Sequence, residues 1–147
     1  MSTAETIAAE ARNESAAWAS SLRAVEEWQP VFSPLAPAEF ALGLETVYEA
    51  YLVHYGAPRL FHPPDRTEAV LLGDYLYAHG LVRIAEAGGV DAVAVMSDLI
   101  SRCAALRADS AEDDGAAWVE AARALGGSPS DSDIAIAIRR HSAKVAA

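Results

Sequence analysis

Runs of acidic side chains are the first candidates for chemistry in this chain, because carboxylates are the ligands that Mg²⁺ prefers. Glu112, Asp113 and Asp114 form an uninterrupted acidic run, and Asp131 and Asp133 form a second, split pair. Both groups stand at the start of segments with helical periodicity, where negative charge complements the helix dipole. We therefore expect both groups to cap helix starts in contact with solvent rather than to hold a metal.

Histidine and cysteine offer little for a metal site or a nucleophile. His54 and His79 fall in predicted helices and His62 in a loop, and their positions lack the short ligand spacings of a zinc site. We expect His54 to be a polar helix residue. Cys103 is the single cysteine, which excludes an internal disulfide, and we expect it to be a small buried helix residue. No grouping of serine, histidine and acid indicates a catalytic nucleophile.

Asp74 is the charge that most needs an explanation, because it interrupts a strongly apolar segment. A buried carboxylate is costly unless it is paired. We therefore expect Asp74 to be buried, with a backbone or cationic partner in the core or in an interface, and to have a structural role rather than a direct role in substrate binding.

Length and composition limit the class of protein. The chain has 147 residues, of which 52% are hydrophobic, so we expect one packed domain. A net charge of -10 argues against nucleic acid or an anionic membrane as a direct partner. No segment has the pattern of a secretory signal or the length of a membrane span. A cytoplasmic protein is the expectation.

Helical periodicity runs through nearly the whole sequence, and prolines and glycines divide it. We expect a first helix within residues 2–27, with Trp18, Leu22 and Val25 on one stripe. The further helices are expected at 37–56, 66–87, 90–108 and 112–125, with a last helix after the turn at residues 126–129. Gly56 is the expected end of the second helix, Asp65 and Glu68 have capping-box spacing, and the glycine pair at 88–89 ends the third.

The last helix is expected to be capped by Ser128, with Pro129 at its first position. The alternation of isoleucine and alanine over residues 134–138 leaves a strand as the less favoured alternative. The expected fold is all-α, a bundle of five to seven helices in one domain. Its parts are an N-terminal helix and linker (1–35), a central set of helices (36–108) and C-terminal helices (109–147).

Two central motifs resemble a known family. Glu45 precedes Leu52, Val53 and His54 at the end of one predicted helix, and the next helix carries Gly73-Asp74-Tyr75-Leu76 near its start. In this order and spacing they resemble the centre of the trans-polyprenyl diphosphate synthases, over about residues 40–108. The resemblance implies a bundle similar to half of an isoprenoid synthase.

The chain departs from that family at the metal site. The resemblance implies acids at positions 55, 56 and 59, but the chain has Tyr55, Gly56 and Arg59, which cannot supply the oxygen ligands that Mg²⁺ needs. The paired arginines that bind diphosphate are missing, and Arg66 is a lone cation there. Diphosphate ionisation depends on such metal ions. We expect no activity from this chain alone, no cofactor of its own, and Mg²⁺ only on a catalytic partner.

Short family members without aspartate-rich motifs are the non-catalytic small subunits of heterodimeric polyprenyl diphosphate synthases. The resemblance therefore implies a regulatory subunit that binds the catalytic large subunit. It would help to set the chain length of the prenyl product, which serves the biosynthesis of an isoprenoid quinone such as menaquinone. The expected interface residues, on 67–87 and 90–108, are Val70, Leu71, Asp74, Tyr75, Tyr77, Leu81, Met96, Leu99 and Ile100. The candidates for lining or gating the product tunnel are Tyr48, Tyr51, Leu52, Tyr55 and Leu76.

Two other classes stay open. One is a self-associating helical protein that regulates a partner or binds an apolar ligand and has no role in prenyl transfer. The other is an independent enzyme, which would need a metal site that these residues do not assemble.

Overall fold

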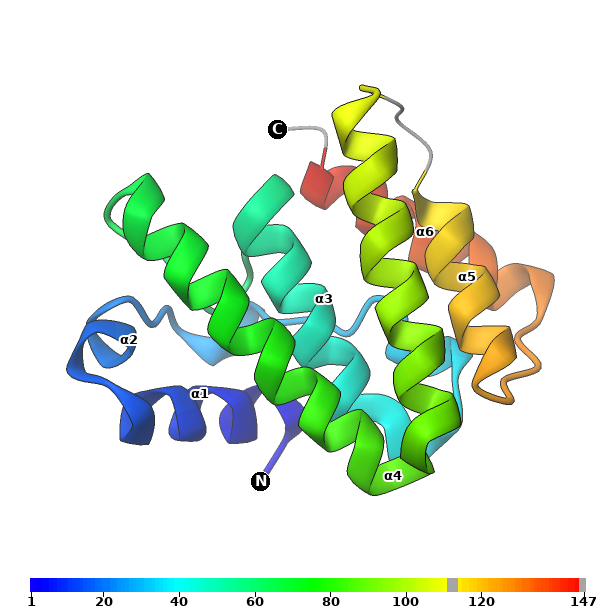
Figure 1. Cartoon of the computed structure of the whole chain (residues 1–147), viewed down its shortest axis with the longest axis horizontal. Helices are drawn as coiled ribbons and strands as arrows, with labels where there is room; N and C mark the ends of the chain where they lie inside the picture. The colour runs from blue at the N-terminus through cyan, green and yellow to red at the C-terminus, as the bar shows by residue number, and fades with distance from the viewer. Residues whose placement is uncertain (111–113, 146–147) are drawn as a thin grey trace.

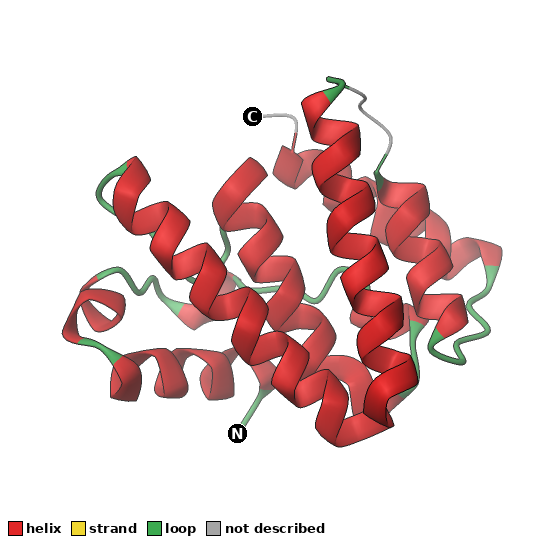
Figure 2. Cartoon of the chain, in the orientation of Figure 1, coloured by secondary structure: helices red, strands yellow, loops and turns green. Residues whose placement is uncertain are grey.

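The structure is a computed structural model, and it describes residues 1–110 and 114–145. The described residues form six α-helices and three short 3-10 helices with no strand, so the protein is all-α as predicted (Figure 2). The α-helices are α1 (Thr3–Glu14), α2 (Ala16–Ser20), α3 (Ala41–Tyr55), α4 (Arg66–Ala108), α5 (Gly115–Ala124) and α6 (Asp131–Val145). The 3-10 helices are η1 (Val25–Glu27), η2 (Ser33–Leu35) and η3 (Ala38–Phe40).

Helix α3 is the centre of the molecule. All its residues from Gly43 to Val53 are buried, which is unusual for a helix that contains two glutamates and three polar aromatic or hydroxyl residues. The first arm of helix α4 crosses in front of α3, and its second arm lies beside α3 (Figure 1). Helix α1 lies beneath the first arm, α5 packs against the second arm, and α6 contacts α5 and α3. The polar groups between Gly43 and Val53 must therefore find their partners inside the protein.

The two arms of α4 meet at Gly89, which has φ 71° and ψ -159°. This conformation is open almost only to glycine, and it turns the chain through the sharp bend seen at the bottom of Figure 1. The predicted break at residues 88–89 is thus confirmed. The first arm carries Leu72, Leu76 and Ile84 inward, and the second carries Met96, Leu99 and Cys103 inward.

Two apolar clusters lie on either side of α3. The larger one joins α3, the second arm of α4, α5 and α6 around Tyr48, Tyr51 and Trp118. The smaller one joins α1 and the first arm of α4 around Ile7, Phe61 and Leu72. Cys103 is 1% exposed, which confirms that it is a small core residue.

Two local predictions were wrong. The segment 2–27 is not one helix, because the Ser15 side chain accepts hydrogen bonds from the amides of Ala17 and Trp18 and starts a new short helix, α2. The last helix is capped by Ser130 and not by Ser128: the amide of Asp133 donates to the Ser130 hydroxyl oxygen, and the Asp133 carboxylate accepts from the Ser130 amide. The stretch 134–138 is helical, which confirms the favoured prediction over the strand alternative.

The predicted helix 37–56 begins later than expected, because η3 covers Ala38–Phe40 and α3 starts at Ala41. Other boundaries agree with the sequence. Helix α3 ends at Gly56 as predicted, where an added Cβ would lie 2.8 Å from the carbonyl oxygen of Lys144. The Asp65 side chain accepts from the amide of Glu68 and caps the start of α4. Of the predicted helix 112–125, residues 111–113 lie outside the described residues, and α5 begins at Gly115.

Candidate functional site

A buried ion cluster occupies the side of α3 that faces the linker. Glu45 and Glu49 are one helical turn apart and both are 0% exposed. The loop after α3 folds back and places Arg59 between them, with its Nη1 2.6 Å from Glu45 Oε1 and its Nε 2.9 Å from Glu49 Oε1. Each carboxylate also accepts two backbone N–H groups, from Val31 and Ser33 for Glu45 and from Arg59 and Leu60 for Glu49.

The cluster holds the linker and the loop against α3. The Arg59 guanidinium also lies over the rings of Trp28 and Tyr48, at 4.9 and 5.0 Å from their centroids. Burial by itself would lower the pKa of Arg59, but the charges and hydrogen bonds of Glu45 and Glu49 outweigh it and raise that pKa. The cluster is therefore a permanent, internally compensated group of charges.

A second polar network joins α3 to the C-terminal half of the chain. The Tyr48 hydroxyl lies 2.7 Å from His141 Nδ1, and His141 Nε2 lies 2.6 Å from Asp114 Oδ1. The Tyr51 hydroxyl donates to the other oxygen of Asp114 and accepts from Arg107 Nε at 2.9 Å. The network thus connects Tyr48 and Tyr51 of α3 to Arg107 of α4, Asp114 at the start of α5 and His141 of α6.

Asp114 corrects the expectation for its acidic run. It is 0% exposed and makes no side-chain hydrogen bond to cap α5, whereas the sequence predicted a solvated cap. Burial by itself would raise the pKa of Asp114, but hydrogen bonds from His141 and Tyr51 and the charges of His141 and Arg107 outweigh it and lower that pKa. Glu112 and Asp113, the other members of the run, lie outside the described residues. Asp131 and Asp133 are exposed in the first turn of α6, as predicted.

The order tyrosine, histidine, aspartate is one that general-base catalysis uses, because the acid orients the imidazole toward a hydroxyl. Here Tyr48, His141 and Asp114 are 0%, 3% and 0% exposed. Burial also raises the pKa of the Tyr48 and Tyr51 hydroxyls well above its usual range, so both stay protonated. The network is closed to a substrate, and its hydrogen bonds hold helices together.

Tyr55 and Gly56, where the resemblance implies metal-binding acids, lie at the C-terminal end of α3. The His54 ring stacks on Tyr77 of α4, with centroids 5.2 Å apart, and its Nε2 is 3.5 Å from Asp74 Oδ1. Gly73 leaves the room for this contact, since a Cβ there would collide with the His54 ring. Burial lowers the pKa of His54, although the Asp74 charge opposes that shift.

Asp74 is not buried, contrary to the prediction. Its side chain is 69% exposed, and its ion-pair partner among the described residues is His54. The reason is its angular position on α4, since Leu72, Gly73 and Leu76 turn inward and Asp74 points away from the core. His54 itself is the polar helix residue that the sequence predicted.

The predicted interface residues fall into two groups. Val70, Leu71 and Asp74 are exposed, and Tyr75, Tyr77, Leu81 and Ile100 are half-buried. Met96 and Leu99 are 0% and 2% exposed and pack in the chain's own core, so the structure removes them from the contact surface. The first arm of α4 therefore carries most of the surface that a partner would reach.

The predicted tunnel residues do not line a space. Tyr48, Tyr51 and Leu52 are 0% exposed and Leu76 is 1% exposed. Tyr48 packs edge-on against Phe32 and Trp118, and Tyr51 packs against Trp118, so these aromatic rings fill the core. Only Tyr55 of this set reaches the surface, at 38% exposed. In this chain its own side chains fill the volume around the four buried residues, and a tunnel role for any of the set stays a prediction.

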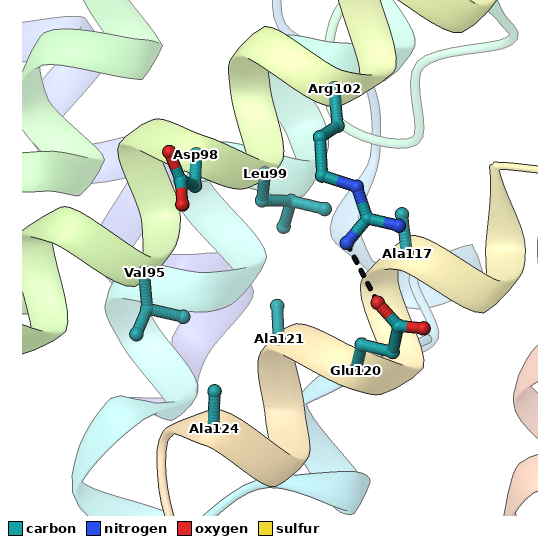
Figure 3. Close-up of a pocket in the computed structure, with 8 residues that line it drawn as sticks. All are labelled: Val95, Asp98, Leu99, Arg102, Ala117, Glu120, Ala121 and Ala124. Carbon is teal, nitrogen blue, oxygen red and sulfur yellow. Dashed lines mark hydrogen bonds and ion pairs between the residues drawn. The ribbon is translucent and has the colours of Figure 1, made fainter.

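A shallow pocket lies between the second arm of α4 and α5 (Figure 3). Its volume is about 190 Å³, below the roughly 300 Å³ at which ligand pockets begin. Alanines 117, 121 and 124 line one wall. The ion pair between Arg102 and Glu120, with Nη1 2.7 Å from Oε2, closes the pocket. The pocket offers a ligand no unpaired cation.

No group of three or more histidine, cysteine, aspartate or glutamate side chains in residues 1–110 and 114–145 is placed to hold a metal ion. Over the same part of the chain, no helix is long and apolar enough to cross a membrane.

The comparisons with known proteins add no relative. A scan against protein-family models, a search of curated proteins and a search of solved structures each returned no match. The resemblance to polyprenyl diphosphate synthases therefore rests on the sequence motifs alone.

The sequence reasoning missed both buried networks. One signal was available: Glu45 and Glu49 stand one turn apart on a helix that is otherwise apolar, and buried acids need a cation. Arg59 was the nearest cation in sequence. No comparable local signal connects Asp114 to Tyr51, which is 63 positions away.

Proposed function

We propose that this chain is the non-catalytic subunit of a heterodimeric polyprenyl diphosphate synthase, and that it binds the catalytic subunit through the outer face of α4. The observation that carries the proposal is the apolar line on that face. Leu71 and Val82 are each 55% exposed, and Val70 is 40% exposed, on a helix whose opposite face is fully packed. This is the segment to which the resemblance assigns subunit contact.

The buried ion cluster supports the non-catalytic part of the proposal. Where the resemblance implies a third metal-binding acid, the chain has Arg59, and its charge is already balanced by Glu45 and Glu49. Tyr55 and Gly56 replace the first two acids. Arg59, Glu45 and Glu49 are thus engaged with one another inside the fold, which supports a chain without a metal site at this position.

The buried tyrosines limit how the subunit acts on product length. Because Tyr48, Tyr51, Leu52 and Leu76 are enclosed in this chain's core, we do not propose that they contact the growing prenyl chain. The influence on product length would pass through the position of α4 on the catalytic subunit. The product would be the side chain of an isoprenoid quinone.

Reconstitution tests this proposal. The chain is mixed with a catalytic polyprenyl diphosphate synthase that carries both aspartate-rich motifs and comes from the same genome, and prenyl transfer is measured with isopentenyl diphosphate and an allylic primer. We expect activity in the mixture, little from the synthase alone, and none from this chain alone. A synthase whose activity, product length and elution volume are all unchanged by the chain contradicts the proposal.

A pair of matched variants locates the contact. Leu71→Arg with Val82→Arg places two charges on the outer face of α4, and it should abolish co-elution without unfolding the chain, since both side chains are more than half exposed. Ile136→Arg changes an apolar residue on α6 that is 37% exposed and serves as the control. Equal loss of binding in both variants would place the contact elsewhere.

A further inference from the structure

The outer face of the first arm of α4 has the spacing of a helix-pairing surface. Leu71, Asp74, Ala78, Val82 and Ala85 follow each other in steps of three and four residues and are all exposed; we call them the outer stripe. The inner face of the same arm is buried against α3, as Figure 1 shows. The stripe therefore lies on the free side of the helix.

The second arm carries its own exposed line of small side chains. Val90 is 84% exposed, and Ala94, Ser97, Ser101 and Ala105 follow it at helical spacing, all exposed. Such residues allow the backbone of another helix to approach closely. In Figure 1 the first arm passes in front of α3, and the second arm lies beside α3 and next to α5.

The acidic side chains on and beside these exposed lines have few cationic partners among the described residues. Asp74 lies in the stripe itself, and Glu86, Asp91 and Asp98 are exposed beside it. No ion pair within residues 1–110 and 114–145 involves Glu86, Asp91 or Asp98, and Asp74 has only the contact with His54 at 3.5 Å.

The cations of α4 do not neutralise these acids. Arg83 is bound to Glu10, Arg102 pairs with Glu120, and Arg107 is bound to Tyr51 and Asp114. Arg66, at the first position of α4, is the remaining arginine of the helix. The exposed lines of the two arms are therefore largely apolar, with Asp74 in the first line and Glu86, Asp91 and Asp98 along one flank, on a chain whose net charge is -10.

We propose that the outer stripe binds a helix of a partner chain that is apolar in its centre and supplies arginine or lysine side chains, one of them to Asp74. A partner that covers the stripe takes Asp74 out of water, and a desolvated carboxylate needs a cation. A second copy of this chain brings the same acids onto the same face, and like charges across an interface disfavour association. The acids thus select a different, basic partner over self-pairing. This inference rests on the proposed function, since it describes the chemistry of that partner.

Self-association of the chain alone is the first test. The on-face variant combines Asp74→Asn, Glu86→Gln, Asp91→Asn and Asp98→Asn. The off-face variant removes the same number of charges at exposed acids elsewhere, with Glu14→Gln, Glu26→Gln, Asp109→Asn and Asp131→Asn. By sedimentation equilibrium at low salt, we expect the wild type and the off-face variant to be monomeric and the on-face variant to self-associate at least about ten-fold more tightly. A wild-type homodimer that Leu71→Arg disrupts, or equal behaviour of the two variants, overturns the inference.

A peptide probe tests the choice of partner charge. The probe is a designed amphipathic peptide helix with leucine on its apolar stripe and arginine on both flanks, and its counterpart carries glutamate in place of arginine. By fluorescence anisotropy, we expect the arginine peptide to bind the wild type and the off-face variant, and to bind the on-face variant about ten-fold more weakly. Asp74→Asn alone should weaken binding more than Glu86→Gln alone.

Because the two variants have the same net charge, a non-specific attraction between a basic peptide and an acidic protein changes both equally. Equal affinities for the two variants, or equal binding of the glutamate peptide, therefore overturn the inference. Neither assay contains a synthase, so their failure leaves the reconstitution test standing, and failure of reconstitution leaves these assays interpretable.

Discussion

At the scale of single residues, the distinctive feature of the chain is its set of buried charged side chains. Glu45 and Glu49 are fully buried. Burial costs a carboxylate several kcal/mol of hydration free energy, and ion pairs or hydrogen bonds must compensate for that loss. Arg59 and four backbone amides supply the compensation. The cluster thereby fixes the linker before α3 and the loop after it onto the same helix.

Replacing Arg59 should therefore cost far more stability than replacing an exposed arginine. Arg59→Met leaves two carboxylates buried without a cation, for which we expect a loss of about 3–5 kcal/mol in the free energy of unfolding. Urea denaturation followed by circular dichroism measures the loss.

Arg102→Met is the matched control, because it breaks an ion pair whose side chains are 52% and 60% exposed. Exposed pairs contribute about 0–1 kcal/mol. If the two variants unfold at similar urea concentrations, the buried cluster does not stabilise the fold in the way described.

At the scale of elements, α4 acts as two helices joined at one glycine. Its 43 residues would form a straight rod without the bend, and the rod could not cover α3 with both arms. Gly89 provides the bend through its positive φ, and an added Cβ there meets nothing within 4 Å. The need for glycine comes from the backbone alone.

Gly89→Ala should lower the free energy of unfolding by about 1–3 kcal/mol, because a side chain disfavours this backbone conformation. Val90→Ala is the control at the next position, where the side chain is 84% exposed and we expect a change within about 0.5 kcal/mol. Thermal unfolding of both variants measures the difference. A Gly89→Ala protein as stable as Val90→Ala would mean that α4 does not depend on this bend.

At the scale of the whole molecule, local patterns predicted the helices but not the contacts that join them. The helix α3 could be predicted from its periodicity, and the bend in α4 from its glycine pair, because helical spacing and backbone freedom are local properties. The break at Ser15 was missed because an alanine-rich segment is equally compatible with one helix, and a single serine cap decides the matter.

Partners distant in sequence were missed for a different reason. Asp114 looked like a solvated cap, and its burial depends on His141, Tyr51 and Arg107, which come from three other helices. Asp74 looked buried because its neighbours are apolar, and its exposure depends on which side of α4 faces α3. Neither fact is contained in the segment around the residue.

The network around Asp114 makes the stability of the whole molecule depend on pH. The folded-state pKa of Asp114 is lower than that of an unfolded aspartate, because His141, Tyr51 and Arg107 stabilise its charged form. A carboxylate of this kind contributes stability above its unfolded pKa of about 3.9, and the contribution is lost as the pH falls through the lower folded pKa.

We therefore expect the free energy of unfolding to fall by on the order of 1 kcal/mol more in the wild type than in Asp114→Asn between pH 5 and pH 3. Asp98→Asn, which changes an exposed carboxylate, should keep the wild-type pH profile. Urea titrations at each pH measure the three profiles. Because Asp114 connects α3, α4, α5 and α6, its protonation should loosen them together, and a wild type and an Asp114→Asn protein with parallel profiles would show that the network does not control acid unfolding.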